Sequence, residues 1–358
     1  MDGAPLESVA TRLRETIDRN REYTIVGNDN IFRASFVDNH VFSSEHDRAR
    51  ALLAELLKEY DGIPVEEAVP GEWKDGPLGP SWVVSSSEPA PGPAPRPDAA
   101  LRLLRRDLRL VHGVGPALES RLARRGYGAL DDLVWHRRLA PAARRALDAL
   151  ASGDPARIAR FCADRRGRSH PDVFLATELH DETEHVYFDL ETLGLFSRPV
   201  ILFGIARLRN GRIEVEQHLV RDPAHERSAL AAALASLGRG GLLVSFNGRS
   251  FDVPYLAERA AYYGLDHTVP THHLDLLPIS RRLWREGLPD CRLCTIEAGV
   301  LGHERSDDLP SAMVPEFYTE YHRTGNPGPL VPILSHNCED LVSMVRLVTR
   351  LREVCHGS

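Results

Sequence analysis

The stretch that most constrains the fold of this chain runs from Val186 to Thr192 and carries two carboxylates near its end. Because side chains alternate along a strand, Asp189 and Glu191 face one side while Phe188 and Leu190 fill the other. Two anions this close repel each other unless a cation lies between them, and Mg²⁺ or Mn²⁺ prefers such oxygen ligands. By itself the pattern also fits a solvent-exposed strand end. The segments that follow are needed to choose between this alternative and a cation site.

The segments that follow alternate between strand and helix patterns. Asn210-Gly211 separates two apolar runs and is the strongest short signal for a β-hairpin. Antiparallel strands followed by alternating helices and strands predict an α/β fold, with a mixed sheet flanked by helices. We expect strands over 199–207, 212–220 and 242–246, and helices over 228–237 and 253–263.

Two further acidic segments lie downstream. Asp252 follows the turn dipeptide Asn247-Gly248 and begins a helix, where an acid either caps the helix or serves a site. Asp340 opens a long C-terminal helix together with His336, and their spacing of four places both on one face. Each segment alone is a weak signal.

Together these three segments resemble the DEDD superfamily of 3′–5′ exonucleases, the DnaQ-like branch of the ribonuclease H fold. Within it, residues 183–355 are most similar to the YprB-like ribonuclease H group. The resemblance implies a ribonuclease H-like domain. It further implies that two divalent cations, Mg²⁺ or Mn²⁺, bind to Asp189, Glu191, Asp252 and Asp340.

The same resemblance implies that His336 is the general base or orients the attacking water. In the His-type members a histidine precedes the last aspartate by five residues, whereas His336 precedes Asp340 by four. A structural role for His336 in its loop therefore stays open. The amide of Asn247 positions either its own turn or a substrate phosphate.

A basic segment precedes this domain. Residues 101–170 contain 16 Lys or Arg and 7 Asp or Glu, although the whole chain has a net charge of −7. A Gly-x-Gly turn and a helix that opens with Pro116 resemble the helix-hairpin-helix motif, whose backbone N–H groups meet DNA phosphates. The alternative is a helical bundle with a solvated basic face. The candidate nucleic-acid contacts are Gly113, Gly115, Arg121, Arg124 and Arg125.

The chain before the basic segment carries no recognisable chemistry. We expect helices over 6–17 and 47–60 and short strands over 23–26 and 32–37. Alternate prolines then predict an extended linker. The predicted parts are an α+β N-terminal extension (1–82), a Pro-rich linker (83–98), a small all-α basic module (99–170) and the ribonuclease H-like domain (180–356).

Composition argues against membrane insertion and disulfide scaffolding. No apolar run approaches the ~20 residues that span a bilayer, and the N-terminus lacks the basic-then-apolar order of a signal peptide. Five scattered cysteines fit reduced thiols, and Cys291-x-x-Cys294 lacks a second ligand pair for zinc. We expect a cytoplasmic protein without a membrane partner.

The resemblance of the three acidic segments implies a metal-dependent 3′–5′ exonuclease that acts on single-stranded ends. The basic module is predicted to tether it to nucleic acid. We favour DNA over RNA as the partner. Two alternatives remain: a non-catalytic nucleic-acid-binding protein, and a structure-specific or RNA-processing nuclease with the same fold. Fold resemblance supports a reaction class but does not select the substrate.

Overall fold

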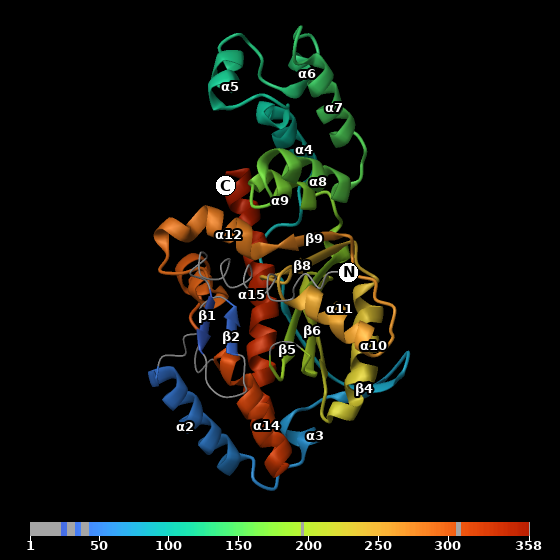
Figure 1. The fold of residues 1–358 in the computed structure, drawn as a ribbon, viewed down its shortest axis with the longest axis vertical. Helices are drawn as coiled ribbons and strands as arrows, with labels where there is room; N and C mark the ends of the chain where they lie inside the picture. The colour runs from blue at the N-terminus through green and yellow to red at the C-terminus, as the bar shows by residue number, and fades with distance from the viewer. Residues whose placement is uncertain (1–22, 27–32, 37–42, 195–196, 306–308, 358) are drawn as a thin grey trace, which may run out of the picture.

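The computed structural model describes residues 23–26, 33–36, 43–194, 197–305 and 309–357. The molecule is elongated, with a helical module at one end, a sheet in the middle and two helices, α2 and α14, at the other end (Figure 1). The helix expected over 6–17 lies outside the described residues. The strands expected over 23–26 and 32–37 are present as β1 (Tyr23–Val26) and β2 (Arg33–Phe36), and the helix expected over 47–60 as α2 (Ser43–Glu59).

A seven-stranded mixed sheet forms the centre, in the order β3-β4-β7-β6-β5-β8-β9. Strands β3 to β7 pair antiparallel, whereas β8 runs parallel to β5 and β9 runs parallel to β8. This confirms the predicted fold class. The strands are β3 (Glu72–Gly76), β4 (Gly79–Pro89), β5 (His185–Thr192), β6 (Val200–Arg209), β7 (Arg212–Leu219), β8 (Leu242–Ser245) and β9 (His272–Asp275).

The predicted hairpin joins β6 to β7. Asn210 and Gly211 have φ values of 52° and 71°, and positive φ at both central residues is what a type I′ turn requires. Arg209 pairs directly with Arg212 across the turn. The expected strands and helices of this region are all present, and their bounds differ from the prediction only at terminal residues.

Helices cover both faces of the sheet. Phe188 belongs to the apolar core that includes residues of α10 (Glu226–Leu237) and α11 (Asp252–Tyr262). Tyr187, one residue earlier on β5, belongs to the core formed with α12 (Leu276–Trp284) and the long helix α15 (Leu330–His356). Strand alternation places Asp189 and Glu191 on one face, as the sequence predicted, and the structure shows that this face meets α15.

The basic segment forms a separate helical module with its own core (Figure 1). Gly113 has a φ of 85°, Gly115 caps α5, and Pro116 is the first residue of that helix. Whether this turn acts as a helix-hairpin-helix motif stays a prediction. The module contains α4 (Pro97–Arg106), η1 (Leu108–Leu110), α5 (Pro116–Ala123), α6 (Leu130–Leu133), α7 (Ala140–Leu150), α8 (Pro155–Arg166) and α9 (Pro171–Thr177).

A buried ion pair anchors the module to the sheet domain. Arg352 of α15 donates from Nε to Oε1 of Glu178, just after α9, over 2.9 Å. Arg352 also donates from Nη1 to the Pro93 carbonyl, so one side chain joins α15, the end of α9 and the chain that leads into α4.

The structure differs from the linker expected over 83–98 in its first half. Residues 83–89 belong to β4 and pair with His218 to Arg212 of β7. The prolines begin only at Pro89, so the preceding amides are free to join a sheet. The N-terminal extension therefore contributes β3 and β4 to the edge of the central sheet, and α4 already begins at Pro97.

The remaining helices are short or lie around α15. Within the described ranges, no helix combines the length and hydropathy needed to cross a membrane. They are α3 (Val65–Ala68), η2 (Glu182–Glu184), η3 (Pro223–His225), η4 (Arg285–Gly287), α13 (Leu293–Ile296), the π-helix η5 (Glu297–Leu301), η6 (Ser311–Met313) and α14 (Val314–Thr324).

Replacing Glu226 by Ala tests a buried polar network on the α10 face. Glu226 accepts bonds from Nε and Nη2 of Arg259 (2.7 and 2.5 Å), from the Tyr263 hydroxyl (2.7 Å) and from the Val200 amide (2.9 Å). The variant leaves a buried arginine uncompensated, so we expect a loss of about 3–5 kcal/mol in the free energy of unfolding, measured with urea. As a control, Glu320→Ala breaks an exposed ion pair with Arg323 and should lower the free energy of unfolding by about 1 kcal/mol or less. Equal losses would contradict the prediction.

Candidate active site

Asp189 and Glu191 lie near the end of β5, in the middle of the sheet. Asp189 stands opposite Gly204 of β6, and Glu191 stands opposite Leu202. The register shifts between Glu191 and Thr192, an irregularity of the kind that re-aims side chains beside functional sites. Glu191 is buried, whereas Asp189 keeps partial contact with solvent.

Asn337 of α15, which sequence reasoning missed, orients Asp189. Its Nδ2 donates to Asp189 Oδ2 over 2.7 Å, and its Oδ1 accepts from Nε2 of Gln217 over 2.9 Å. A Cβ at Gly204 would clash with the Asn337 amide, so glycine is required where this side chain crosses β6. The buried Gln217–Asn337 relay therefore fixes one rotamer of Asp189.

Asp252 is the first residue of α11, as predicted, and its carboxylate faces β5. Oδ1 accepts the backbone N–H of Leu190 over 3.3 Å. The preceding turn contains Asn247 at a φ of 64° and is held by Asp275, which accepts the backbone N–H groups of Asn247 (2.8 Å) and Arg249 (3.1 Å). Asp275 also caps α12. The structure thus shows a turn-forming backbone role for Asn247.

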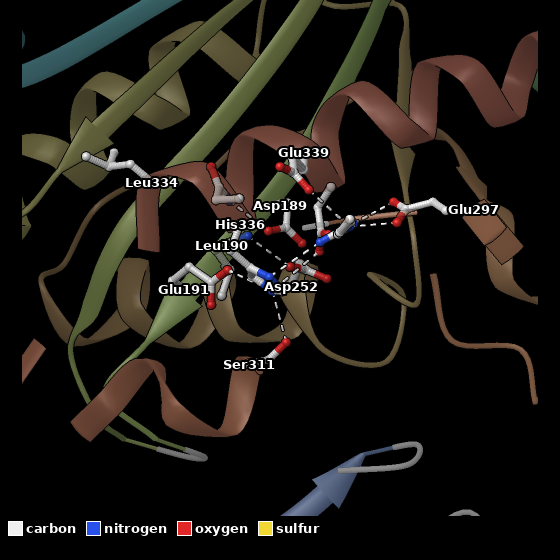
Figure 2. Close-up of polar contacts among 12 residues, drawn as sticks. Asp189, Leu190, Glu191, Asp252, Glu297, Ser311, Leu334, His336 and Glu339 are labelled. Atoms are coloured by element: carbon white, nitrogen blue, oxygen red, sulfur yellow. Dashed lines mark hydrogen bonds and ion pairs between the residues drawn. The ribbon is translucent and has the colours of Figure 1, made fainter. Parts of the chain in front are cut away.

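His336 and Asp340 lie one turn apart on α15. The helix begins earlier than expected, at Leu330, so neither residue opens it. Nε2 of His336 is 3.9 Å from Oδ2 of Asp340, 3.9 Å from Oε1 of Glu191 and 3.1 Å from Oγ of Ser311 in η6. Figure 2 shows His336, Asp189, Glu191 and Asp252 turned towards one centre. The structure therefore brings the predicted acidic residues and His336 together from β5, α11 and α15.

A second missed feature is an arginine inside this centre. Nη2 of Arg305 is 2.5 Å from Oδ1 of Asp340 and 2.5 Å from Oε1 of Glu297, and its Nε is 2.6 Å from Oε2 of Glu297. Glu297 is fully buried in the π-helix η5. Glu297 lies in a stretch that contributes to the family resemblance, but no local signal links it to Arg305 eight residues later.

The electrostatics of the site disfavour ionised carboxylates. Burial and the negative charges of Asp252 and Asp340 raise the pKa of Asp189 well above its ordinary value, although His336 and Asn337 oppose this. Burial, with smaller contributions from the charges of Asp275 and Glu191, raises the pKa of Asp252 to about 8. Bound positive charge would lower both pKa values.

The donor set fits a hard divalent cation. Carboxylate oxygens are the ligands that Mg²⁺ and Mn²⁺ prefer, and a bound cation would offset the burial that raises the pKa values of Asp189 and Asp252. In the part of the chain that the structure describes, no three His, Cys, Asp or Glu side chains stand at a spacing that would hold a metal ion. Asp340 is bonded to Arg305 instead.

Comparison with known proteins shows what this part of the chain is similar to. Residues 186–352 match the family model described as RNase_H superfamily, and they include Asp189, Asp252 and Asp340. The mixed sheet and flanking helices of this segment are consistent with a ribonuclease H-like α/β fold. The uncharacterized protein YprB of Bacillus subtilis (strain 168) is 30% identical over 189 residues, which are 51% of this chain and 45% of YprB. The chain thus spans less than half the length of that relative.

Among solved structures, the family B DNA polymerase of the archaeon Pyrobaculum calidifontis superposes with a TM-score of 0.37 at 18% identity. The match covers 49% of this chain and 27% of the polymerase. At that TM-score the likeness supports no inference about this chain.

The pKa of Asp252 predicts how stability depends on pH when divalent cations are removed by a chelator. The folded state keeps this proton up to about pH 8, whereas the unfolded chain releases it near pH 4. Between about pH 4 and pH 8 the folded state therefore binds more protons than the unfolded chain. The contribution of Asp252 to the free energy of unfolding falls as pH rises through this range. Urea unfolding should show that decline, and Asp252→Asn should flatten it. Parallel pH profiles for the two proteins would argue against the raised pKa.

Proposed function

We propose that this protein is a divalent-metal-dependent nuclease that shortens nucleic acid from a 3′ end. One observation carries the proposal: Asp189, Glu191, Asp252 and Asp340 converge with His336 in a ribonuclease H-like fold, and burial opposes the ionisation of Asp189 and Asp252. Such an anionic cluster is suited to cations that bind a phosphodiester. Attack at the terminal linkage would release nucleotides one at a time.

The four carboxylates would hold two cations, Mg²⁺ or Mn²⁺. When bound, these cations supply charge neutralisation at the phosphate and Lewis-acid activation of water. The protein contributes orientation. Asn337 fixes Asp189 from α15, and the Leu190 amide fixes Asp252 against β5. Both contacts remove rotamer freedom before substrate arrives, which favours a preorganised site.

His336 is the proposed proton acceptor, and its surroundings define when it can act. Nη1 of Arg305 lies 3.4 Å from Nδ1 of His336. Because arginine only donates, this contact makes Nδ1 the acceptor and leaves the ring proton on Nε2, beside Ser311. In this arrangement His336 orients its neighbours. Accepting a proton at Nε2 requires the Arg305 contact to loosen.

The helical module is the proposed tether to DNA. The turn around Gly113 and Gly115 presents the N-terminus of α5 to solvent, where backbone N–H groups favour a phosphate. Arg121, Arg124 and Arg125 lie exposed on or just after the same helix. Their charge would hold the nucleic-acid backbone without reading sequence.

Cleavage of matched 5′-labelled single-stranded DNA and RNA tests the activity. With Mg²⁺ or Mn²⁺ we expect a ladder that shortens from the 3′ end, and no products with chelator. Asp189→Asn and Asp340→Asn each remove a proposed cation ligand and should reduce the rate by at least about 100-fold. Comparing DNA with RNA identifies the substrate.

The exposed strand residue Asp75 provides the matched control, because Asp75→Asn makes the same chemical change away from the site. It should cleave at the wild-type rate. Retained cleavage in either site variant would refute the assignment of that carboxylate. Tight binding without cleavage under any metal would instead favour the non-catalytic binding protein.

Salt dependence of binding tests the tether. Replacing Arg121, Arg124 and Arg125 by Ala should weaken binding to DNA. Each lost phosphate contact should reduce the slope of log K against log salt by about 0.7 to 0.9, as measured by fluorescence anisotropy. Replacing Arg48, Arg50 and Arg323 by Ala removes the same charge at the opposite end of the molecule, in α2 and α14 (Figure 1), and should leave the slope unchanged. Equal slopes for the two triple variants would contradict the tether and favour a helical bundle without a nucleic-acid contact.

A further inference from the structure

The guanidinium of Arg305 contacts two carboxylates: that of the buried Glu297 and that of Asp340 in the proposed metal site. Its Nη2 lies 2.5 Å from both Glu297 Oε1 and Asp340 Oδ1, while its Nε is 2.6 Å from Glu297 Oε2 and 3.4 Å from Glu339 Oε2. The Arg305 side chain is only 4% exposed. Figure 2 shows Glu297 facing the centre from one side and Asp189 and His336 lying on the other. The arginine is therefore part of the site's architecture.

The two carboxylates that share Arg305 differ in their freedom to leave it. The Glu297 side chain is 0% exposed, and a carboxylate this deep that loses its cation is left as an uncompensated buried charge. The Asp340 side chain is 19% exposed and can exchange its partner for another cation. The contact with Glu297 thus anchors Arg305, and the contact with Asp340 is the one that can open.

The local backbone supports Glu297 as the anchor. Glu297 begins the π-helix η5, which follows directly on α13, ends at Leu301 and is followed by Gly302 with a φ of 67°. Single-turn π-helical segments of this kind often occur at functional sites. Between Gly302 and Arg305 the chain returns to the centre, where Nε and Nη2 of Arg305 meet both oxygens of Glu297.

We infer that Arg305 is a positioning residue that holds Asp340 in the cation-free site and competes with divalent cations for it. The inference rests on the proposed metal-dependent function. A cation that uses Asp340 displaces the Nη2 contact, while Glu297 retains the guanidinium. Arg305 thereby raises the cation concentration that is needed to fill the site. Breaking one charge-assisted hydrogen bond corresponds to about a tenfold change in cation affinity.

Mn²⁺ binding to the full chain, measured by isothermal titration calorimetry without nucleic acid, tests the inference. The double variant Arg305→Met with Glu297→Met removes one positive and one negative charge, so the net charge is unchanged. Its affinity should rise about tenfold because Asp340 is free. Glu297→Gln should lower the affinity, since it leaves Arg305 with Asp340 as its main anionic partner. If the pair had only a structural role, the two variants would not change the Mn²⁺ affinity in opposite directions.

The controls separate this inference from the function on which it rests. Arg323→Met with Glu320→Met removes an exposed pair far from the site and should leave Mn²⁺ affinity unchanged. Asp189→Asn should abolish Mn²⁺ binding. If binding is absent, or persists in Asp189→Asn, both proposals fail.

If Asp189→Asn loses binding but the Met pair binds like the wild type, only the role of Arg305 fails. Circular dichroism checks the fold of each variant. If the Met pair does not fold, Arg305→Gln replaces it, because glutamine still donates a hydrogen bond to Glu297. An affinity in Arg305→Gln no higher than that of the wild type overturns the inference.

Discussion

Repulsion between buried carboxylates is the constraint on which the rest of the structure depends. Asp189, Asp252 and Asp340 approach from three elements. Burial and the negative charges of Asp252 and Asp340 raise the pKa of Asp189, and burial with the charges of Asp275 and Glu191 raises the pKa of Asp252. The chain offsets this repulsion with specific donors: the Asn337 amide for Asp189, the Leu190 N–H for Asp252 and the Arg305 guanidinium for Asp340. An apolar lining would pack more easily, so the polar arrangement is best understood as serving chemistry at the cost of stability.

Local sequence signals predicted most of the fold around the site. Alternation along β5 assigned Asp189 and Glu191 to one face, Asn210-Gly211 marked the hairpin, and the spacing of His336 and Asp340 placed them on one side of a helix. Each of these patterns is contained within a few residues, so it survives in whatever tertiary context the chain adopts.

What the sequence did not predict depends on contacts between distant segments. The Arg305–Glu297 pair joins a loop to a π-helix, and the relay from Gln217 to Asn337 joins β7 to α15. No periodicity or motif encodes such pairs. The pairing of β4 with β7 was missed for the same reason, since nothing local to residues 83–89 identifies their partner strand.

One helix links the two halves of the molecule. Helix α15 carries His336, Asn337 and Asp340 beside β5, and Arg352 beside the helical module. Asp340 and Arg352 are about three turns apart, or roughly 18 Å along a straight helix. Because one continuous helix carries both sets of residues, the length of α15 fixes the separation between the carboxylates and the helical module.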